Sequence, residues 1–177
     1  MRSVARPLLV VVAVVIAAFG YVRLAERKGY ALAEGSAAPA FRLPALAGGD
    51  LELRSLRGRV VVLNFWATWC PPCVGEMPSL ERLHKALGGE GVAVVGVSVD
   101  EDEAVLRRFV DQHKLTFALL RDPGGPIASG QYHTTGYPET FVLDAQGVVR
   151  EHYVGPADWA TPEAIEHFRR FVKGAAR

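Results

Sequence analysis

The chain has 177 residues, of which 50% are hydrophobic and 22% are charged, and its formal net charge at neutral pH is +1. This length fits one ordinary globular domain with an additional segment. The nearly neutral charge and the dispersed basic residues lack the electrostatic pattern of a nucleic-acid-binding protein, so no nucleic-acid partner is expected.

The additional segment lies at the start of the chain, where residues 7–22 carry no charge and are mostly apolar. Such a span is typical of a membrane anchor or an export signal. As a helix it would rise roughly 24 Å, slightly less than the roughly 30 Å hydrocarbon core of a bilayer. Cleavage after Gly20 is one alternative, but Arg23 and Arg27 follow the span at once and favour an uncleaved anchor. Residues 1–28 are therefore predicted to be an anchor or signal segment.

The next segment, residues 29–38, is rich in small residues and is predicted to be a linker to a folded domain at residues 39–174. Strands are predicted at residues 51–53, 59–66, 92–99, 117–120, 140–143 and 148–154. Helices are predicted from the cysteines to about residue 87, after residue 100, briefly before residue 131, and from residue 162 to about residue 173. This alternation, which ends in a hairpin, indicates an α/β fold whose mixed sheet is covered by helices on both faces.

Side chains that cap helices mark two of the predicted helix starts. Asp100 and Glu103 have the three-residue spacing of a capping box. Thr161 precedes Pro162, and this pair is typical of an N-cap followed by the first helical residue. We therefore expect Asp100 and Thr161 to be the N-caps of their helices.

The chain has two cysteines, Cys70 and Cys73, in the stretch NFWATWCPPCVGEMP between a predicted buried strand and a predicted helix. A C-x-x-C pair is typical either of half a zinc site or of a redox-active dithiol. Zinc needs two more ligands, but the chain has no further cysteine and its five histidines show no ligand spacing. A purely structural disulfide is disfavoured because so small a loop restrains little chain entropy. The position therefore favours thiol-disulfide chemistry.

Cys70 lies where the helix is predicted to begin, and unpaired amides and the helix dipole favour a reactive thiolate at such a place. Pro71 and Pro72 suit the first helical turn, where backbone donors have no partner. Cys73 follows one turn later and can attack a mixed disulfide formed at Cys70, which releases the reduced partner. Cys70 is thus the predicted nucleophile and Cys73 the predicted resolving cysteine.

The stretch FWATWCPPCVGEMP resembles the active site of the thioredoxin superfamily, and in particular of its membrane-tethered TlpA/ResA-like and CcmG/DsbE-like branch. The resemblance covers about residues 37–172. The stretch APAFRLPALAGGDLELRSLRGRVVVLNFWATWC is similar to the leading hairpin and first core strand of this branch, and GYPETFVLDAQGVVREHYVG is similar to its cis-proline loop and closing hairpin. It implies a thioredoxin-like fold with an N-terminal hairpin and a central insertion, preceded by a single hydrophobic helix. Pro78 matches the proline that kinks the active-site helix in this superfamily.

The resemblance also implies roles for single residues. Thioredoxin has a buried aspartate where this chain has Asn64, so another proton acceptor is needed. Glu76 is the candidate, because the branch has a functional glutamate at that offset; the alternative is a solvated helix residue. The peptide between Tyr137 and Pro138 is implied to be cis, to face the cysteines and to pair with an extended substrate segment. The predicted substrate-binding residues are Trp69, Pro71, Pro72, Tyr137 and Pro138.

Four further residues near the motif are interpreted as follows. Trp69 is expected in an apolar rim that receives the partner, and Trp66 in the core. Glu139 either influences the choice of partner or is simply exposed. His133 would be an additional ligand if the thiols bound copper, and is otherwise an ordinary loop residue.

The resemblance implies an enzyme, a monomeric protein-disulfide reductase without cofactor or metal. Residues 7–22 would tether it to the cytoplasmic membrane with its domain on the periplasmic or extracytoplasmic side, or it would be secreted after cleavage. A membrane thiol donor of the CcdA/DsbD kind would regenerate it. Its substrates would be exported proteins such as apocytochrome c, whose C-x-x-C-H sequence must be reduced before haem is attached. Two alternatives on the same fold are a Cu(I)-delivery module that binds through both cysteines and a thiol peroxidase.

Overall fold

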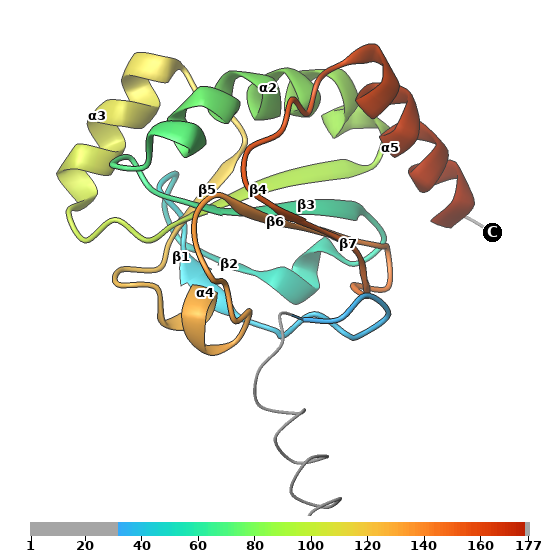
Figure 1. Ribbon diagram of the computed structural model, residues 1–177, viewed down its shortest axis with the longest axis horizontal. Coiled ribbons are helices and arrows are strands. Elements are labelled where there is room, and N and C mark those ends of the chain that lie inside the picture. The colour runs from blue at the N-terminus through green and yellow to red at the C-terminus, as the bar shows by residue number, and fades with distance from the viewer. Residues whose placement is uncertain (1–31, 176–177) are drawn as a thin grey trace, which may run out of the picture. The chain divides into compact units, whose positions relative to one another are not determined.

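A five-stranded mixed sheet forms the centre of residues 32–175, the part of the chain that the computed structural model describes (Figure 1). Its strands are β3 (Val60–Trp66), β4 (Val92–Ser98), β5 (Ala118–Arg121), β6 (Glu139–Leu143) and β7 (Val149–Val154). They lie in the order β5-β4-β3-β6-β7; β3, β4 and β5 are parallel, whereas β6 is antiparallel to β3 and β7 is antiparallel to β6. This arrangement confirms the predicted α/β fold with a mixed sheet.

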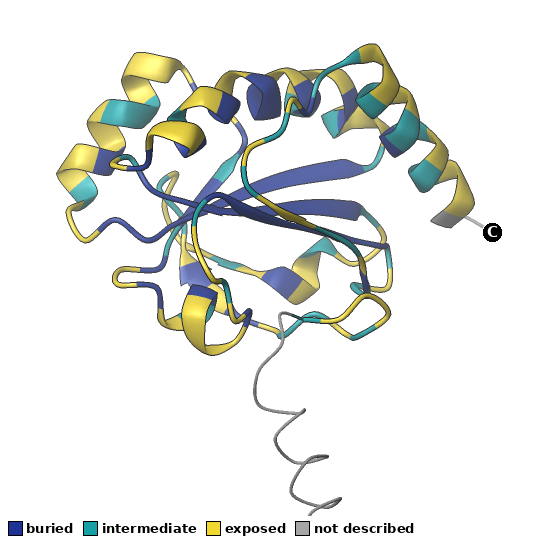
Figure 2. Ribbon diagram, in the orientation of Figure 1, coloured by how far each residue is buried: buried dark blue, intermediate teal, exposed yellow. Residues whose placement is uncertain are grey.

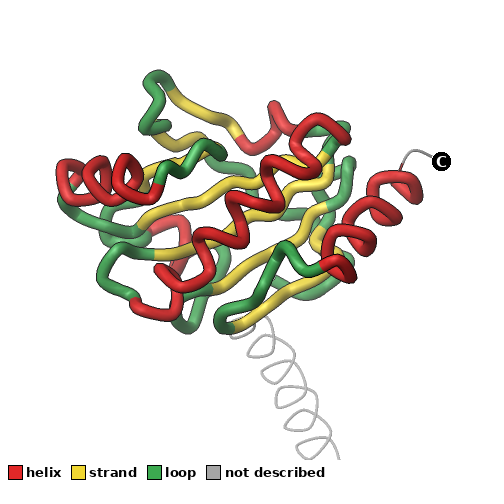
Figure 3. The backbone as a smooth tube through the Cα atoms, turned by 90° about the horizontal axis from the view of Figure 1, so that it is seen from above, coloured by secondary structure: helices red, strands yellow, loops and turns green. Residues whose placement is uncertain are grey.

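Helices lie on both faces of the sheet, as predicted (Figures 1 and 3). On one face are α2 (Pro71–Leu87), α3 (Glu103–His113) and α5 (Pro162–Ala175). On the other face are α4 (Pro126–Gly130), the hairpin of β1 (Arg42–Pro44) and β2 (Asp50–Glu52), and the 3₁₀ turn η1 (Leu53–Leu56). A second 3₁₀ turn, η2 (Gly88–Glu90), follows α2.

Every residue of the neighbouring strands β3 and β4 is buried, so side chains of other elements cover both faces of these strands (Figure 2). The apolar stripe of α2 supplies part of this cover: Met77, Leu80, Leu83 and Leu87 are all fully buried. Burial of each such side chain contributes roughly 1.5–3 kcal/mol relative to exposure. The stripe therefore holds α2 firmly against the sheet and so fixes the position of its first turn, which carries the cysteines.

The start of α3 differs from the prediction, because Asp102 and not Asp100 is its N-cap. Asp102 Oδ1 accepts a hydrogen bond from the backbone N–H two residues later at 2.7 Å. Asp100 is instead buried, and its carboxylate accepts hydrogen bonds from the hydroxyls of Thr68 and Ser98, both at 2.6 Å. The hydrogen bonds from Thr68 and Ser98 hold the carboxylate of Asp100 away from the helix start, so Asp102 caps the helix instead. At α5, Thr161 caps as predicted, with Oγ1 accepting from the backbone N–H three residues later at 3.1 Å.

The chain between β4 and Pro138 forms α3, β5 and α4, and β5 extends the sheet as an edge strand. At the other edge, Ala37 forms a bridge with Val148, so the start of the described chain runs beside β7. Within residues 32–175 no helix is both long and apolar enough to cross a membrane. The predicted hydrophobic helix at residues 7–22 lies outside the described residues.

Candidate active site around Cys70 and Cys73

Cys70 and Cys73 form a disulfide at the start of α2, with their Cα atoms 5.3 Å apart. Cys70 is the N-cap of the helix, and the backbone N–H of Cys73 points at its sulfur at 3.3 Å. Cys70 is 5% exposed and Cys73 is fully buried. The helix start therefore presents one sulfur toward solvent, directs an amide at it, and keeps the second sulfur behind it.

Apolar side chains form a rim around Cys70, the less buried of the two cysteines. Trp69 has 65% of its surface exposed, the largest exposed aromatic side chain described. Its ring meets that of Tyr137 edge to face, with centroids 6.0 Å apart. Pro71 and Pro72 occupy the first two helical positions and are exposed. By contrast Trp66, on β3, is fully buried, which confirms its assignment to the core.

The loop before β6 brings Tyr137 and Pro138 to the cysteines. The peptide bond between them is cis, as the resemblance implied. The carbonyl oxygen of Tyr137 lies 3.4 Å from Cys70 Sγ, so a reduced Cys70 thiol is within reach to donate a hydrogen bond to it. Burial raises the pKa of the half-buried Tyr137 phenol above its ordinary value. The phenol therefore stays neutral beside the site at physiological pH.

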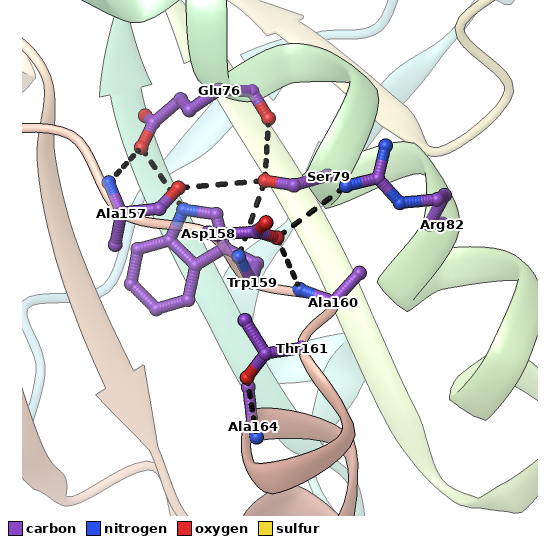
Figure 4. Close-up of polar contacts among 9 residues, drawn as sticks. All are labelled: Glu76, Ser79, Arg82, Ala157, Asp158, Trp159, Ala160, Thr161 and Ala164. Carbon is purple, nitrogen blue, oxygen red and sulfur yellow. Dashed lines mark hydrogen bonds and ion pairs between the residues drawn. The ribbon is translucent and has the colours of Figure 1, made fainter.

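The carboxylate of Glu76, three residues after Cys73 in α2, is buried, and Figure 4 shows its contacts with the connection between β7 and α5. One oxygen, Oε2, accepts hydrogen bonds from the backbone N–H of Ala157 at 3.1 Å and from the indole N–H of Trp159 at 3.0 Å. The other, Oε1, accepts from the side-chain amide of Asn64 at 2.8 Å. Burial raises the pKa of Glu76 above its ordinary value, although these three donors act in the opposite direction. The reading of Glu76 as a solvated helix residue is wrong, because the helix turns this side chain toward the sheet.

Asn64 links Glu76 to the neighbouring strand β6. Its amide also donates to the hydroxyl of Thr140 at 2.8 Å, and these two residues pair directly across β3 and β6. Asn64 Oδ1 is buried and has no hydrogen-bond partner among the described residues. An amide at this position therefore orients the carboxyl of Glu76 but holds no ionisable group of its own.

A short strap, residues 157–160, closes over Glu76, and the sequence gives no signal of it. Its backbone N–H at Trp159 donates to Ser79 Oγ at 3.2 Å, and Asp158 forms an exposed ion pair with Arg82 at 3.4 Å (Figure 4). Trp159 lies in a loop, so it belongs to no periodic pattern that would mark it as buried. Thr68 was missed for a similar reason: its backbone N–H and hydroxyl both bind Asp100, which fixes the loop just before Cys70.

Glu139 and His133 make no hydrogen bond with either cysteine sulfur among the described residues. Glu139 is fully buried on β6, so its reading as an exposed residue is wrong. Glu139 can be buried because both of its carboxylate oxygens have hydrogen-bond partners, one from His152 on the neighbouring strand and one from Thr135 in the preceding loop. His133 is exposed, with a left-handed φ of 54°. Within residues 32–175 no group of three or more histidine, cysteine or acidic side chains has an arrangement suited to hold a metal ion.

The comparisons with known proteins agree with this geometry. The sequence profile described as the AhpC/TSA family matches residues 35–152. The chain is 36% identical over 143 residues to thiol-disulfide oxidoreductase ResA of Halalkalibacterium halodurans, covering 80% of this chain and 78% of that protein. The chain belongs to the ResA-like thiol-disulfide oxidoreductases of the thioredoxin family. This oxidoreductase is also 40% identical over 133 residues to thioredoxin-like protein YneN of Bacillus subtilis, covering 73% of its own chain and 76% of YneN.

Solved structures support the same family. The oxidoreductase matches the crystal structure of a putative thiol:disulfide interchange protein DsbE from Chlorobium tepidum with a TM-score of 0.69 and 30% identity, covering 82% of this chain and 99% of that one. StoA from Bacillus subtilis matches with a TM-score of 0.63 and 25% identity, covering 77% of this chain and 98% of that one. The fold is thus thioredoxin-like, and the Cys70–Cys73 pair supplies the disulfide chemistry that these names describe.

Proposed function

We propose that this oxidoreductase is a reductant that opens disulfides in extracytoplasmic proteins, such as the C-x-x-C-H segment of an apocytochrome c. The observation that supports electron transfer from the enzyme to its substrate is the burial of Glu76. Strong oxidants of this chemistry owe their potential to a stabilised reduced form. Here a carboxyl group lies one helical turn from Cys73 on the same face of α2, and the described side chains place no cation in hydrogen-bond contact with either sulfur. Burial and this neighbouring carboxyl disfavour a thiolate at Cys73, although the helix start favours one at Cys70, and the cost at Cys73 favours the disulfide state of the enzyme.

The exchange begins with the reduced enzyme. Cys70 thiolate attacks one sulfur of the substrate disulfide, which forms a mixed disulfide and expels the other substrate sulfur as a thiolate. Cys73 then loses its proton and attacks Cys70 Sγ, which forms the enzyme disulfide and releases the second substrate thiolate. Two electrons pass to the substrate, and two protons complete its thiols. Trp69, Pro71, Pro72, Tyr137 and Pro138 are the proposed surface that receives the substrate.

Glu76 is the proposed proton acceptor for Cys73. Its raised pKa brings the carboxyl closer to the range in which it can both take up and release a proton. Glu76→Gln should therefore shift the apparent thiol pKa measured by thiolate absorbance against pH. An unchanged titration would assign Glu76 a purely structural role.

The proposed cellular setting follows from residues 7–22, which would anchor the chain in the cytoplasmic membrane with the domain outside the cytoplasm. A membrane dithiol donor of the CcdA/DsbD kind would return the enzyme disulfide to the dithiol. Uncleaved chain that stays in the membrane fraction after alkaline carbonate washing would support the anchor. A chain that is shortened at its N-terminus and found in the soluble periplasmic fraction would replace it with secretion.

The reduction potential tests the direction. The purified full chain would be equilibrated in graded thiol buffers, and the fraction of the Cys70–Cys73 disulfide would be read from tryptophan fluorescence. A potential near or below about −250 mV is expected for a reductant, whereas one near about −120 mV would mark an oxidant and overturn the proposal.

A further inference from the structure

A second buried acid lies on β6, on the opposite side of the strand from Thr140. Glu139, the residue after Pro138, has no exposed surface. Its Oε1 lies 2.7 Å from His152 Nε2, and the His152 side chain is 17% exposed. With Glu139 as a carboxylate, which only accepts hydrogen bonds, the His152 tautomer with its proton on Nε2 is the donor in this pair. The pair therefore joins β6 to β7, the two strands at one edge of the sheet in Figure 1.

The other oxygen of Glu139 holds the loop that reaches the cysteines. Oε2 accepts a hydrogen bond from the backbone N–H of Thr135 at 2.8 Å. The far end of that loop is held as well, because the carbonyl of Pro138 accepts from the backbone N–H of Gly155 at 2.9 Å. Residues 135–138 are thus held at both ends: the Glu139 side chain holds the end at Thr135, and a backbone hydrogen bond holds the end at Pro138. Between these two points lies the Tyr137 carbonyl, 3.4 Å from Cys70 Sγ.

The ring of His152 is itself held in place. It stacks on Phe141 with centroids 4.4 Å apart and planes 8° from parallel, and the two residues pair directly across β6 and β7. This stack orients the imidazole so that Nε2 faces Glu139. A buried carboxylate without such a donor would be costly. His152 therefore decides whether Glu139 can remain inside and hold Thr135.

We propose that His152 is a positioning residue for disulfide exchange: through Glu139 it fixes residues 135–138 and so sets the surface on which an extended protein substrate lies beside Cys70. Backbone next to Pro138 is the part of the site that pairs with such a segment. A small disulfide makes no such contact. The inference rests on exchange at Cys70 and is independent of the direction of electron flow and of the natural substrate.

The test compares two substrates in His152→Phe, which keeps a ring to stack on Phe141 but removes the donor. The full chain would be assayed with a disulfide-bonded C-x-x-C-H peptide and with a small aromatic disulfide. We expect kcat/KM for the peptide to fall at least fivefold, mainly through KM, and the rate with the small disulfide to stay within twofold. His152→Gln, which retains a donor, should recover much of the loss. If the protein proves to be an oxidant, the same comparison applies with the reduced peptide and the reduced aromatic thiol.

A matched control exists in the same chain. His167 Nε2 lies 2.8 Å from Glu151 Oε1, a similar pair that is more exposed and does not hold the loop. His167→Phe should leave both rates unchanged. Hydrogen exchange at the Thr135 amide should accelerate at least tenfold in His152→Phe and not in His167→Phe. Unchanged peptide kinetics, equal losses with both substrates, or unchanged Thr135 exchange would each overturn the proposal. Should His152→Phe not fold, peptide kinetics and Thr135 exchange in Glu139→Leu, which removes both acceptor oxygens, decide with the same expected results.

Discussion

The indole N–H of Trp159 donates a hydrogen bond to Glu76 Oε2 at 3.0 Å, although 83 residues separate the two in the chain. The backbone of Ala157 donates to the same oxygen. The connection between β7 and α5 therefore supplies two of the three donors that hold this buried carboxyl. The protonation of a group next to the cysteines thus depends on a segment near the end of the chain.

Trp159→Phe removes the indole donor and keeps an aromatic ring. We expect the pKa of Glu76 to rise further and the free energy of unfolding at pH 7 to fall by about 1.5–3 kcal/mol, the usual loss for a hydrogen bond to a charged group. Urea unfolding of both proteins at pH 7, and again at a pH low enough to protonate Glu76, measures this. The loss should shrink at the lower pH; an equal loss at both would show that the charge is not involved. Trp69→Phe, at an exposed site, is the control.

Glu76→Gln should change how stability depends on pH. Because burial raises the pKa of Glu76 in the folded state, the folded chain binds a proton more tightly than the unfolded chain does. This contribution to stability is complete below the ordinary pKa of a glutamate and is lost as pH rises through the folded value. As pH rises from the ordinary pKa of a glutamate to the folded value, the natural protein should therefore lose stability relative to Glu76→Gln. Above the folded value, the stability curves of the two proteins should run parallel.

A second glutamate on the same helix gives a control of opposite sign. Burial alone would raise the pKa of Glu81, but hydrogen bonds from Thr116 and the ammonium of Lys85 lower it below its ordinary value. Its contribution is present above the unfolded pKa and is lost as pH falls through the folded one. Relative to Glu81→Gln, the natural protein should lose stability on acidification. Parallel curves for both variants at every pH would contradict the assigned directions.

Cys73→Ala should trap a mixed disulfide. Cys70 faces the partner, while Cys73 is fully buried and is the sulfur placed to resolve the adduct. Without it, the Cys70 adduct with a disulfide-bonded substrate should persist and appear on a non-reducing gel. Cys70→Ala should give no adduct. Adducts of equal amount in the two variants would refute the assignment of nucleophile and resolving cysteine.

Gly96→Ala should weaken the sheet beneath the site. A Cβ atom there would lie 2.9 Å from Leu119 Cδ2 and 3.0 Å from Trp66 Nε1, and both of these side chains are buried. We expect a loss of about 1–3 kcal/mol from overpacking. Gly75→Ala, inside α2 with open space around its Cβ position, should instead stabilise by about 0.5–1 kcal/mol. Thermal unfolding of the two variants compares them directly, and a stabilising Gly96→Ala would contradict the packing.

Much of the fold was accessible from the sequence because its signals are local. Apolar runs at β3 and β4, the helical stripe from Met77 to Leu87, and the Thr161–Pro162 start of α5 each depend on neighbours within a few residues. The prediction that failed at Asp100 shows the limit of such signals. Either aspartate suits an N-cap locally, and the hydrogen bonds that Asp100 accepts from Ser98 and from the more distant Thr68 decide between them.

The sequence by itself determined the two cysteines at a helix start, the α/β class and the candidate residues Glu76 and Pro138, since these depend on spacing and residue type. Only the tertiary structure decided that Glu76 and Glu139 are buried and which residues hold them. Their partners, Trp159 and His152, come from loops and strands 83 and 13 residues away along the chain, and their hydrogen bonds follow no periodic pattern. A carboxylate can be buried without a large loss of stability only where several hydrogen-bond donors surround it, and these donors come together only when the chain folds.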